Sequence, residues 1–237
     1  DLTLIDTSGG VGKQEVLDAI EVLKGPLEGN EEGCLKAMEE LQTLCADKHE
    51  FGKRNQVLMN TKGGMNATMN LLSKDNSPAV IIASANLLNT ICKTNLDNRD
   101  FFEPGGSQRV IDILAAQPLD NPDAEVNTDI TTPVLGLMKT VVKISENNKV
   151  WMMARGAVVV LAAIISSTRP LSSGWNDTTS EACKSVRGLC VHDDLRKEHS
   201  CAFENGRAFM KEGIMAPLIK LAATFSEEGR TEVASGA

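Results

Sequence analysis

The densest group of side chains that could do chemistry lies near the C-terminal end of the sequence. Three cysteines, two histidines and two aspartates fall within 19 residues there: Cys183, Cys190, His192, Asp193, Asp194, His199 and Cys201. Thiolate, imidazole and carboxylate groups are the usual ligands of Zn²⁺. The group lacks the two short ligand pairs of a zinc finger, and no nucleophile is visibly paired with a base and an orienting group. We therefore expect neither a metal site nor a catalytic site here.

A second group resembles a phosphate-binding loop. Residues 8–13 read Ser-Gly-Gly-Val-Gly-Lys after a short apolar run. A P-loop requires Gly-x-x-x-x-Gly-Lys-Ser/Thr, but Thr7 stands at the first glycine and Gln14 at the hydroxyl residue that binds magnesium. The sequence that follows also lacks the strands of a parallel sheet that would hold such a loop. We expect no nucleotide site and no cofactor.

The segments that carry these residues follow a repeated helical pattern. Its clearest copy is residues 77–93, where Ser77 can cap a helix and Pro78 fits the first helical position. Three apolar residues on one helix face recur at spacings of 47, 50 and 48 residues: Leu41, Leu44 and Cys45; Leu88, Ile91 and Cys92; Met138, Val141 and Val142; and Val186, Leu189 and Cys190. An all-helical pattern with a period near this length predicts an α-solenoid.

A glycine recurs ahead of one helix in each later unit, at Gly63, Gly105, Gly156 and Gly213. A glycine with left-handed backbone angles lets one helix turn sharply into the next. Three helices per unit are therefore expected, with the last unit starting on helices at 196–211 and 216–225. The predicted boundaries form one domain, 1–237, with a partial repeat at 13–47, full repeats at 48–95, 96–145 and 146–191, and a partial repeat at 192–237.

Three helices per unit joined at a glycine corner resemble the armadillo-repeat family over nearly the whole chain. Residues 186–196, Val-Arg-Gly-Leu-Cys-Val-His-Asp-Asp-Leu-Arg, and 203–209, Phe-Glu-Asn-Gly-Arg-Ala-Phe, are most similar to the armadillo repeat-containing protein six subfamily. The resemblance implies an all-α, armadillo-type solenoid, a right-handed superhelix of three-helix repeats. It also implies that the third helices line a concave groove for partner proteins.

The resemblance fails at the residues by which some armadillo proteins hold their partners. In importins and catenin-like proteins an asparagine on each third helix binds the partner's backbone, and in importins a tryptophan one turn earlier packs against its side chains. The asparagine positions here hold Thr43, Thr90, Thr140 and Gly188, and the tryptophan positions hold Glu39, Asn86, Gly136 and Lys184. Because a shared fold does not carry a function whose site residues are missing, we do not expect importin-like binding of nuclear-localisation peptides.

Composition narrows the class of partner and the location. The 237 residues are 42% hydrophobic and 3% aromatic, with a net charge of −8, which argues against nucleic acid and anionic membranes as partners. No apolar run approaches the roughly 20 residues of a membrane span. The six cysteines include no Cys-x-x-Cys pair, so we expect buried free thiols in a reducing compartment. The predicted location is the cytoplasm, with the nucleus left open as a second location.

Two local features of the later repeats allow alternatives. Trp175 is expected in a loop over 166–175, either as a lid on the core or as an exposed anchor for a partner, ahead of a capping box at 178–181. Pro133 is expected either in the first turn of a helix or at a kink. Charge also divides along the chain, with a net of −5 over residues 28–50 and +4 over residues 139–187.

These patterns predict a protein-interaction scaffold or adaptor and not an enzyme. The partner, a protein or peptide, is expected along the third-helix groove, at Asn86, Thr90, Thr140, Lys184 and Arg187. Two other functions stay open. A metal- or nucleotide-dependent enzyme would bind stoichiometric zinc or micromolar ATP, and a purely structural segment of a longer protein would make contacts only through its ends. The sequence leaves the oligomeric state open.

Overall fold

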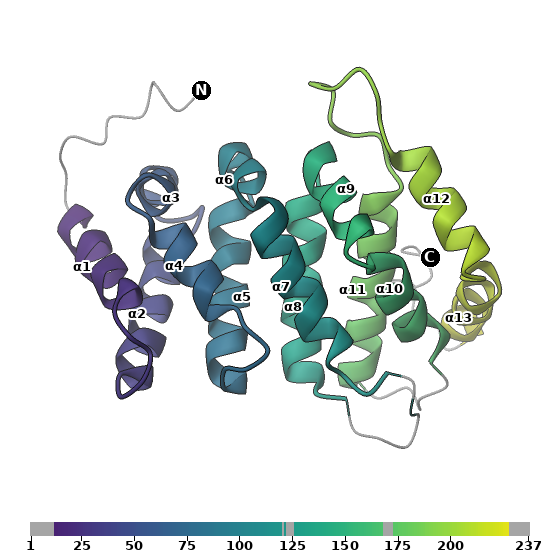
Figure 1. Ribbon diagram of the computed structural model, residues 1–237, viewed down its shortest axis with the longest axis horizontal. Coiled ribbons are helices and arrows are strands. Elements are labelled where there is room, and N and C mark those ends of the chain that lie inside the picture. Colours follow the sequence, from purple (N-terminus) through teal and green to yellow (C-terminus); the bar gives the residue numbers. More distant parts are fainter. Residues whose placement is uncertain (1–11, 120, 122–125, 168–172, 228–237) are drawn as a thin grey trace.

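The computed structural model describes residues 12–119, 121, 126–167 and 173–227, which form 13 helices arranged in a row (Figure 1). These residues contain no strand. Most of the segment that resembles a phosphate-binding loop, residues 8–11, lies outside the described residues. Among the described helices none alone is long and apolar enough to cross a bilayer; one pair, bent by 76° between residues 154 and 157, meets the length and composition test together.

The three middle units each contain three helices. They are α3 (Gly52–Thr61), α4 (Gly64–Leu71) and α5 (Pro78–Cys92); α6 (Leu96–Phe101), α7 (Glu103–Ala115) and α8 (Thr128–Val142); and α9 (Glu146–Ala154), α10 (Ala157–Ser166) and α11 (Ser173–Leu189). Two helices precede them, α1 (Lys13–Lys24) and α2 (Glu31–Leu44), and two follow, α12 (Ala202–Lys211) and α13 (Met215–Glu227).

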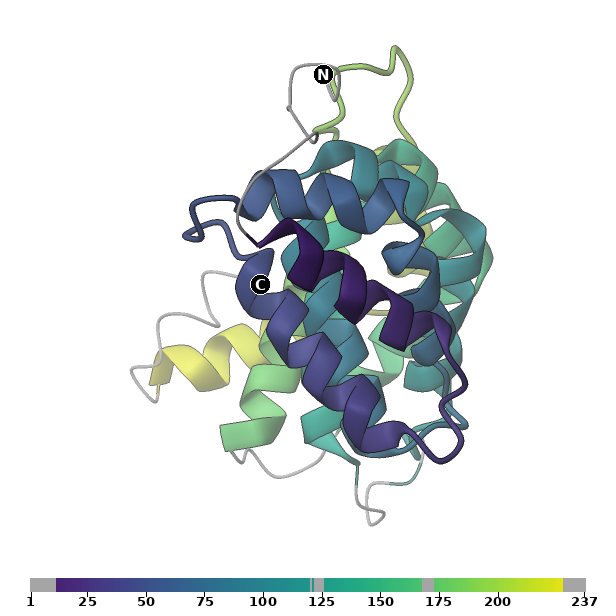
Figure 2. The same cartoon turned by 90° about the vertical axis from the view of Figure 1, so that its left-hand side faces the viewer.

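The third helices form one continuous layer. Helix α2 packs against α5, α5 against α8, and α8 against α11, so four helices far apart in sequence lie side by side (Figure 1). Figure 2 shows the stack from its N-terminal end, with α1 and α2 nearest the viewer. This arrangement confirms the predicted α-solenoid of armadillo type.

The apolar residues of the repeated pattern hold the layers together. Leu41, Leu88 and Met138 are fully buried, and Val186, in the last third helix, is half-buried. The pattern's cysteines behave in the same way: Cys45 and Cys92 are fully buried, and burial raises the pKa of each thiol to about 12. Each layer therefore hides its apolar face against the next, as a repeat stack requires.

Three of the four predicted glycine corners are confirmed. Gly63, Gly156 and Gly213 have φ angles of 79°, 98° and 82°, in the left-handed region that favours glycine. Gly105 was wrongly predicted as a corner, because it lies inside α7 and has no positive φ angle. Helix α6 instead passes into α7 at Phe102, whose φ of −63° and ψ of −31° are helical and whose side chain is buried.

Helix α11 begins earlier than the sequence suggested. The residues of the predicted capping box lie inside the helix, where the Thr178 hydroxyl donates to the Gly174 carbonyl at 2.9 Å and the Thr179 hydroxyl to the Trp175 carbonyl at 2.8 Å. Trp175 is only 4% exposed, in the first turn of α11, so it is not an exposed anchor. Because both hydroxyls donate to carbonyls four residues earlier in the same helix, Thr178 and Thr179 do not mark its start.

Two further local predictions need correction or completion. Pro133 is the sixth residue of α8, so it does not lie in the first turn. The helix is instead capped by Asn127, whose side-chain oxygen accepts a 3.2 Å hydrogen bond from the Ile130 amide. The helix predicted at 196–211 is wrong in its first part, since α12 begins at Ala202 and residues 191–200 form a loop that rises at the upper right of Figure 1. The side chains of that loop bind α9, as described below.

Candidate protein interface

The third-helix face is the surface formed by the exposed and half-buried side chains of α2, α5, α8 and α11. On α5 it includes Asn86, Asn89 and Thr90, all half-buried, and on α8 it includes Lys139 and Thr140, which are half-buried as well. The apolar residues between them point into the core, because a helix packed on one side separates its apolar and polar faces. The sequence pattern thus places these polar groups on the outer side of the third-helix layer.

Polar contacts connect neighbouring helices across this face. The Thr140 hydroxyl of α8 lies 2.5 Å from Asn89 Oδ1 of α5. Further along, Lys139 Nζ donates to Glu181 Oε2 of α11 at 2.6 Å, and Lys184 Nζ lies 3.1 Å from the other oxygen of the same carboxylate. These contacts fix the relative positions of side chains on three successive helices.

The five predicted contact residues are spread along the row. Asn86 and Thr90 lie on α5, where the Thr90 hydroxyl donates to the Asn86 carbonyl at 3.0 Å. Thr140 lies on α8 and bonds to α5, whereas Lys184 and Arg187 lie exposed on α11. The structure therefore places Asn86, Thr90 and Thr140 on two helices that pack together, with Thr140 bonded to Asn89, and sets the two cations on the last third helix. They form a line rather than a pocket.

Charge changes along the third-helix face. Helix α2 exposes four glutamates, at positions 31, 32, 39 and 40, with Lys36 as its one base. Helix α5 carries no charged residue between Pro78 and Cys92. Helix α11 exposes Lys184 and Arg187 near its C-terminal end. Asp177 and Glu181 also lie on α11, so that helix is neutral overall. The face is thus acidic at α2 and has exposed cations only at the C-terminal end of α11, a difference that would orient a charged partner.

A ladder of buried asparagines positions the third helices, and the sequence reading missed it. One lies on the first helix of each unit, and its side-chain amide donates to a carbonyl near the C-terminal end of the preceding third helix. The bonds run from Asn55 to Leu44 at 2.7 Å, Asn98 to Ile91 at 2.9 Å, Asn148 to Val141 at 2.9 Å, and Asn205 to Leu189 at 2.8 Å. They satisfy carbonyls that have no partner within their own helix. The sequence signal that could have identified the ladder is a basic residue within two positions of each asparagine: Arg54, Arg99, Lys149 and Arg207.

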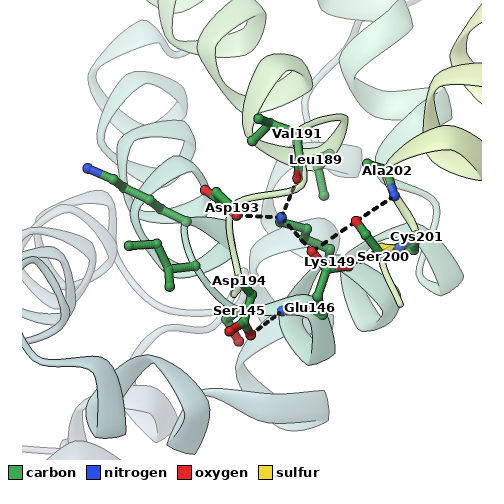
Figure 3. Close-up of polar contacts among 12 residues, drawn as sticks. Ser145, Glu146, Lys149, Leu189, Val191, Asp193, Asp194, Ser200, Cys201 and Ala202 are labelled. Atoms are coloured by element: carbon green, nitrogen blue, oxygen red, sulfur yellow. Dashed lines mark hydrogen bonds and ion pairs between the residues drawn. The ribbon is translucent and has the colours of Figure 1, made fainter. Parts of the chain in front are cut away.

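The fully buried Lys149 of α9 connects that helix to the loop before α12. Lys149 Nζ donates to Glu146 Oε1 at 2.8 Å, to Asp193 Oδ1 at 2.6 Å and to the Val191 carbonyl at 2.6 Å (Figure 3). Burial alone would lower the pKa of Lys149, but the hydrogen bonds to Asp193 and Glu146 outweigh it and the pKa is raised. The lysine is therefore charged and tied to both segments.

Two further carboxylate contacts, made by Glu146 and Asp194, fasten the same loop. Glu146 accepts hydrogen bonds from the Cys201 amide at 3.0 Å and the Ser200 hydroxyl at 3.2 Å. Asp194 is buried and accepts from the Glu146 amide at 3.3 Å and from Arg196 Nε at 2.7 Å. The hydrogen bond from Arg196 is the main reason that the pKa of Asp194 falls to about 2. We call Glu146, Lys149, Asp193, Asp194 and Arg196 the charge clamp.

The charge clamp accounts for part of the group of potential metal ligands near the C-terminal end. Asp193 accepts a hydrogen bond from Lys149, and Asp194 accepts one from Arg196. Burial, together with the Glu146 carboxylate 3.1 Å away, raises the pKa of the Cys201 thiol to about 11. His192 and His199 are exposed. Over the described residues no three His, Cys, Asp or Glu side chains are placed to share a metal ion. The arrangement holds a loop in place.

Comparisons with known proteins define the fold. No protein-family model matches the chain, and no curated protein matches its sequence. Among solved structures, a designed armadillo repeat protein, YIII(Dq)4CqI, superposes with a TM-score of 0.66 at 13% identity, over 87% of this chain and 74% of that one. An engineered protein superposes with a TM-score of 0.58, also at 13% identity, over 100% of this chain and 96% of that one. The chain thus has an armadillo-type repeat fold, and the narrower resemblance to armadillo repeat-containing protein six finds no support among these matches.

Proposed function

We propose that the protein is a scaffold that binds a protein or peptide partner along the third-helix face. The observation that carries the proposal is the line of polar side chains on successive third helices, from the half-buried Asn86, Thr90 and Thr140 to the exposed Lys184. Contacts between helices, from Thr140 to Asn89 and from Lys139 to Glu181, hold this line in register. Such a line presents donors and acceptors at a regular spacing, which suits an extended polypeptide with its own regular backbone groups. An armadillo-type stack supports this reading, since repeat proteins commonly bind through extended surfaces.

The proposal also covers the class of partner and the location. Net charge of −8 disfavours nucleic acid and anionic membranes, and all six cysteines are free thiols, as expected in the cytoplasm or nucleus. We propose no catalytic role, because Asp193 and Asp194 are engaged in the charge clamp and the Cys201 thiol lies against its Glu146 carboxylate. Membership of the armadillo repeat-containing protein six subfamily remains a hypothesis drawn from residues 186–196 and 203–209.

The test is to block the centre of the face. Asn86→Arg and Thr90→Arg each place a long cation on α5 where a partner would lie, without removing a core contact. The matched control is Asn66→Arg on the exposed side of α4. Proteins that co-purify with the wild-type chain should be lost from both α5 variants and kept by the control. Equal recovery from all chains, with unchanged thermal unfolding, would reject the third-helix face as the binding surface.

A further inference from the structure

Helix α13 has an apolar stripe that is only partly covered. Met215, Leu218, Ile219 and Ala222 are spaced as i, i+3, i+4 and i+7, so they lie on one face of the helix. Met215 is 50% exposed and Ile219 is 65% exposed, and the other two are half-buried. We call these four residues the open stripe. Large apolar side chains exposed in one row are typical of an interaction surface.

The equivalent stripes of the complete repeats are covered. Counted from the glycine corner of each unit, the four positions are Met65, Thr68, Met69 and Leu72 in the unit of α4, and Val158, Leu161, Ala162 and Ile165 in α10. All four in the unit of α4 are no more than 9% exposed. In α10, three are no more than 6% exposed, and Val158 is half-buried against the core. Met215 and Ile219 are therefore exposed at positions that are buried or half-buried in those repeats.

In the complete repeats the third helix packs directly on the helix that carries the stripe. Helix α5 packs over α4, and α11 packs over α10. Within residues 173–227 no helix holds the corresponding place beside α13, which projects to the left from the end of the stack in Figure 2. The shape of the missing cover is thus given by the protein's own repeats: one amphipathic helix of about four turns.

Charge on the neighbouring third helix indicates what kind of helix would fit. On α8, Lys139 reaches across to Glu181 of the next third helix at 2.6 Å. Arg187 lies 48 residues later, at the matching position of α11, and is exposed. In the described part of the chain it makes no ion pair. A helix placed beside α11 would bring a side chain of its own to Arg187, and a carboxylate there would repeat the Lys139–Glu181 contact.

We propose that the open stripe and Arg187 together bind an acidic amphipathic helix of a partner protein, seated as the third helices are seated in the complete repeats. A second copy of this chain is a poorer occupant. Its acidic third helix, α2, is already packed against its own α1 and α5, so that copy would have to open its first unit to supply it. This surface shares Arg187 with the third-helix face but lies on α11 and α13, away from Asn86 and Thr90 on α5, and the inference does not depend on the function proposed above.

The probe is a synthetic peptide of residues 30–45, which form an acidic third helix with four glutamates and one lysine. Labelled with a fluorophore and kept reduced, it should bind the intact protein saturably in an anisotropy titration. Ile219→Ser and Arg187→Glu should each weaken binding at least tenfold. The control Val159→Ser removes an apolar side chain of similar exposure, 59% against 65% for Ile219, from α10 and should bind as the wild type does, as should Asn86→Arg.

Three results would overturn the inference. The first is the absence of saturable binding. The second is binding that Ile219→Ser and Arg187→Glu leave unchanged, or that a peptide with Met38→Glu and Leu41→Glu reproduces, because the apolar face would then play no part. The third is a dimer in sedimentation velocity that Ile219→Ser dissociates, because a second copy would then occupy the stripe. Ile219, Arg187 and Val159 are exposed and Asn86 is half-buried on the outer face of α5, so the variants should fold.

Discussion

Replacing Lys149 by methionine tests the charge clamp in the folded protein. Methionine keeps most of the side-chain volume but removes the ammonium group, whose exposed fraction is 0%. Glu146, at 7%, and Asp193, at 24%, would then face the interior without their cation. Breaking a buried pair by removing one partner costs about 3 to 5 kcal/mol, because the remaining charge has lost both water and counter-charge. At roughly 2 to 4 °C per kcal/mol, the melting temperature should fall by about 6 to 20 °C.

A double variant separates the ionic contribution from loss of packing. Glu146→Gln with Lys149→Met removes both charges and should cost clearly less than the two single changes added together. A coupling free energy of more than about 1 kcal/mol is expected from a cycle of urea unfolding measurements. The cost of Lys149→Met should also shrink as the pH is lowered, because Glu146 without its cation is more readily neutralised.

Two results would refute this reasoning. A Lys149→Met cost below about 1 kcal/mol would mean that the ion pairs of Lys149 add nothing beyond packing. Strict additivity in the cycle would mean that Glu146 and Lys149 act independently, despite the 2.8 Å between their charged atoms. In either case, some other contact would have to hold residues 191–200 against α9.

Further predictions concern pH, packing and thiol reactivity. Arg196 holds the pKa of Asp194 at about 2, below its usual 3.8, so its carboxylate adds stability that is present above pH 3.8 and is lost as the pH falls through 2. The loss should be roughly 2 kcal/mol in acid unfolding, and Asp194→Asn should abolish it. Leu88→Ala should cost about 2 to 5 kcal/mol in urea unfolding and Thr90→Ala less than about 1, since Leu88 is fully buried; the reverse order would contradict the helix facing. Cys45 and Cys92, each with a pKa near 12, should react with a thiol reagent only on unfolding, and fast labelling of either in the native protein would contradict their burial.

Periodicity was sufficient to predict the stack. The equivalents of Leu88 recur every 47 to 50 residues because each layer must present the same apolar face to its neighbours. The sequence pattern is therefore a direct consequence of the packing. Gly63, Gly156 and Gly213 could be read for the same reason, because few other residues adopt their φ angles. Gly105 gave a wrong prediction of a corner, since glycine is also tolerated within a helix.

The errors arose where distant contacts decide local structure. Residues 191–200 read as the approach to a helix, but Ser200 and Cys201 bind Glu146, some 55 positions earlier, and that anchors a loop. Lys149 shows the same limit: in sequence it is one more polar residue of a first helix, and only the fold reveals that it is buried. Repeat spacing placed Asn86, Thr90 and Thr140 on the outer side of the third helices, where the structure has them; their role in binding stays a prediction. The asparagine ladder was not foreseen, because its spacing varies between units.

Photo-crosslinking from defined positions tests the proposed binding face most directly. A photoreactive amino acid placed at Asn86 or Thr140, on the third-helix face, should crosslink the same partner protein in native cells. The same group at Asn66 or Asn147, both exposed on other helices, should not. Crosslinks of equal yield at all four positions, or a partner captured only at the two control positions, would contradict the assignment of this face as the partner-binding surface.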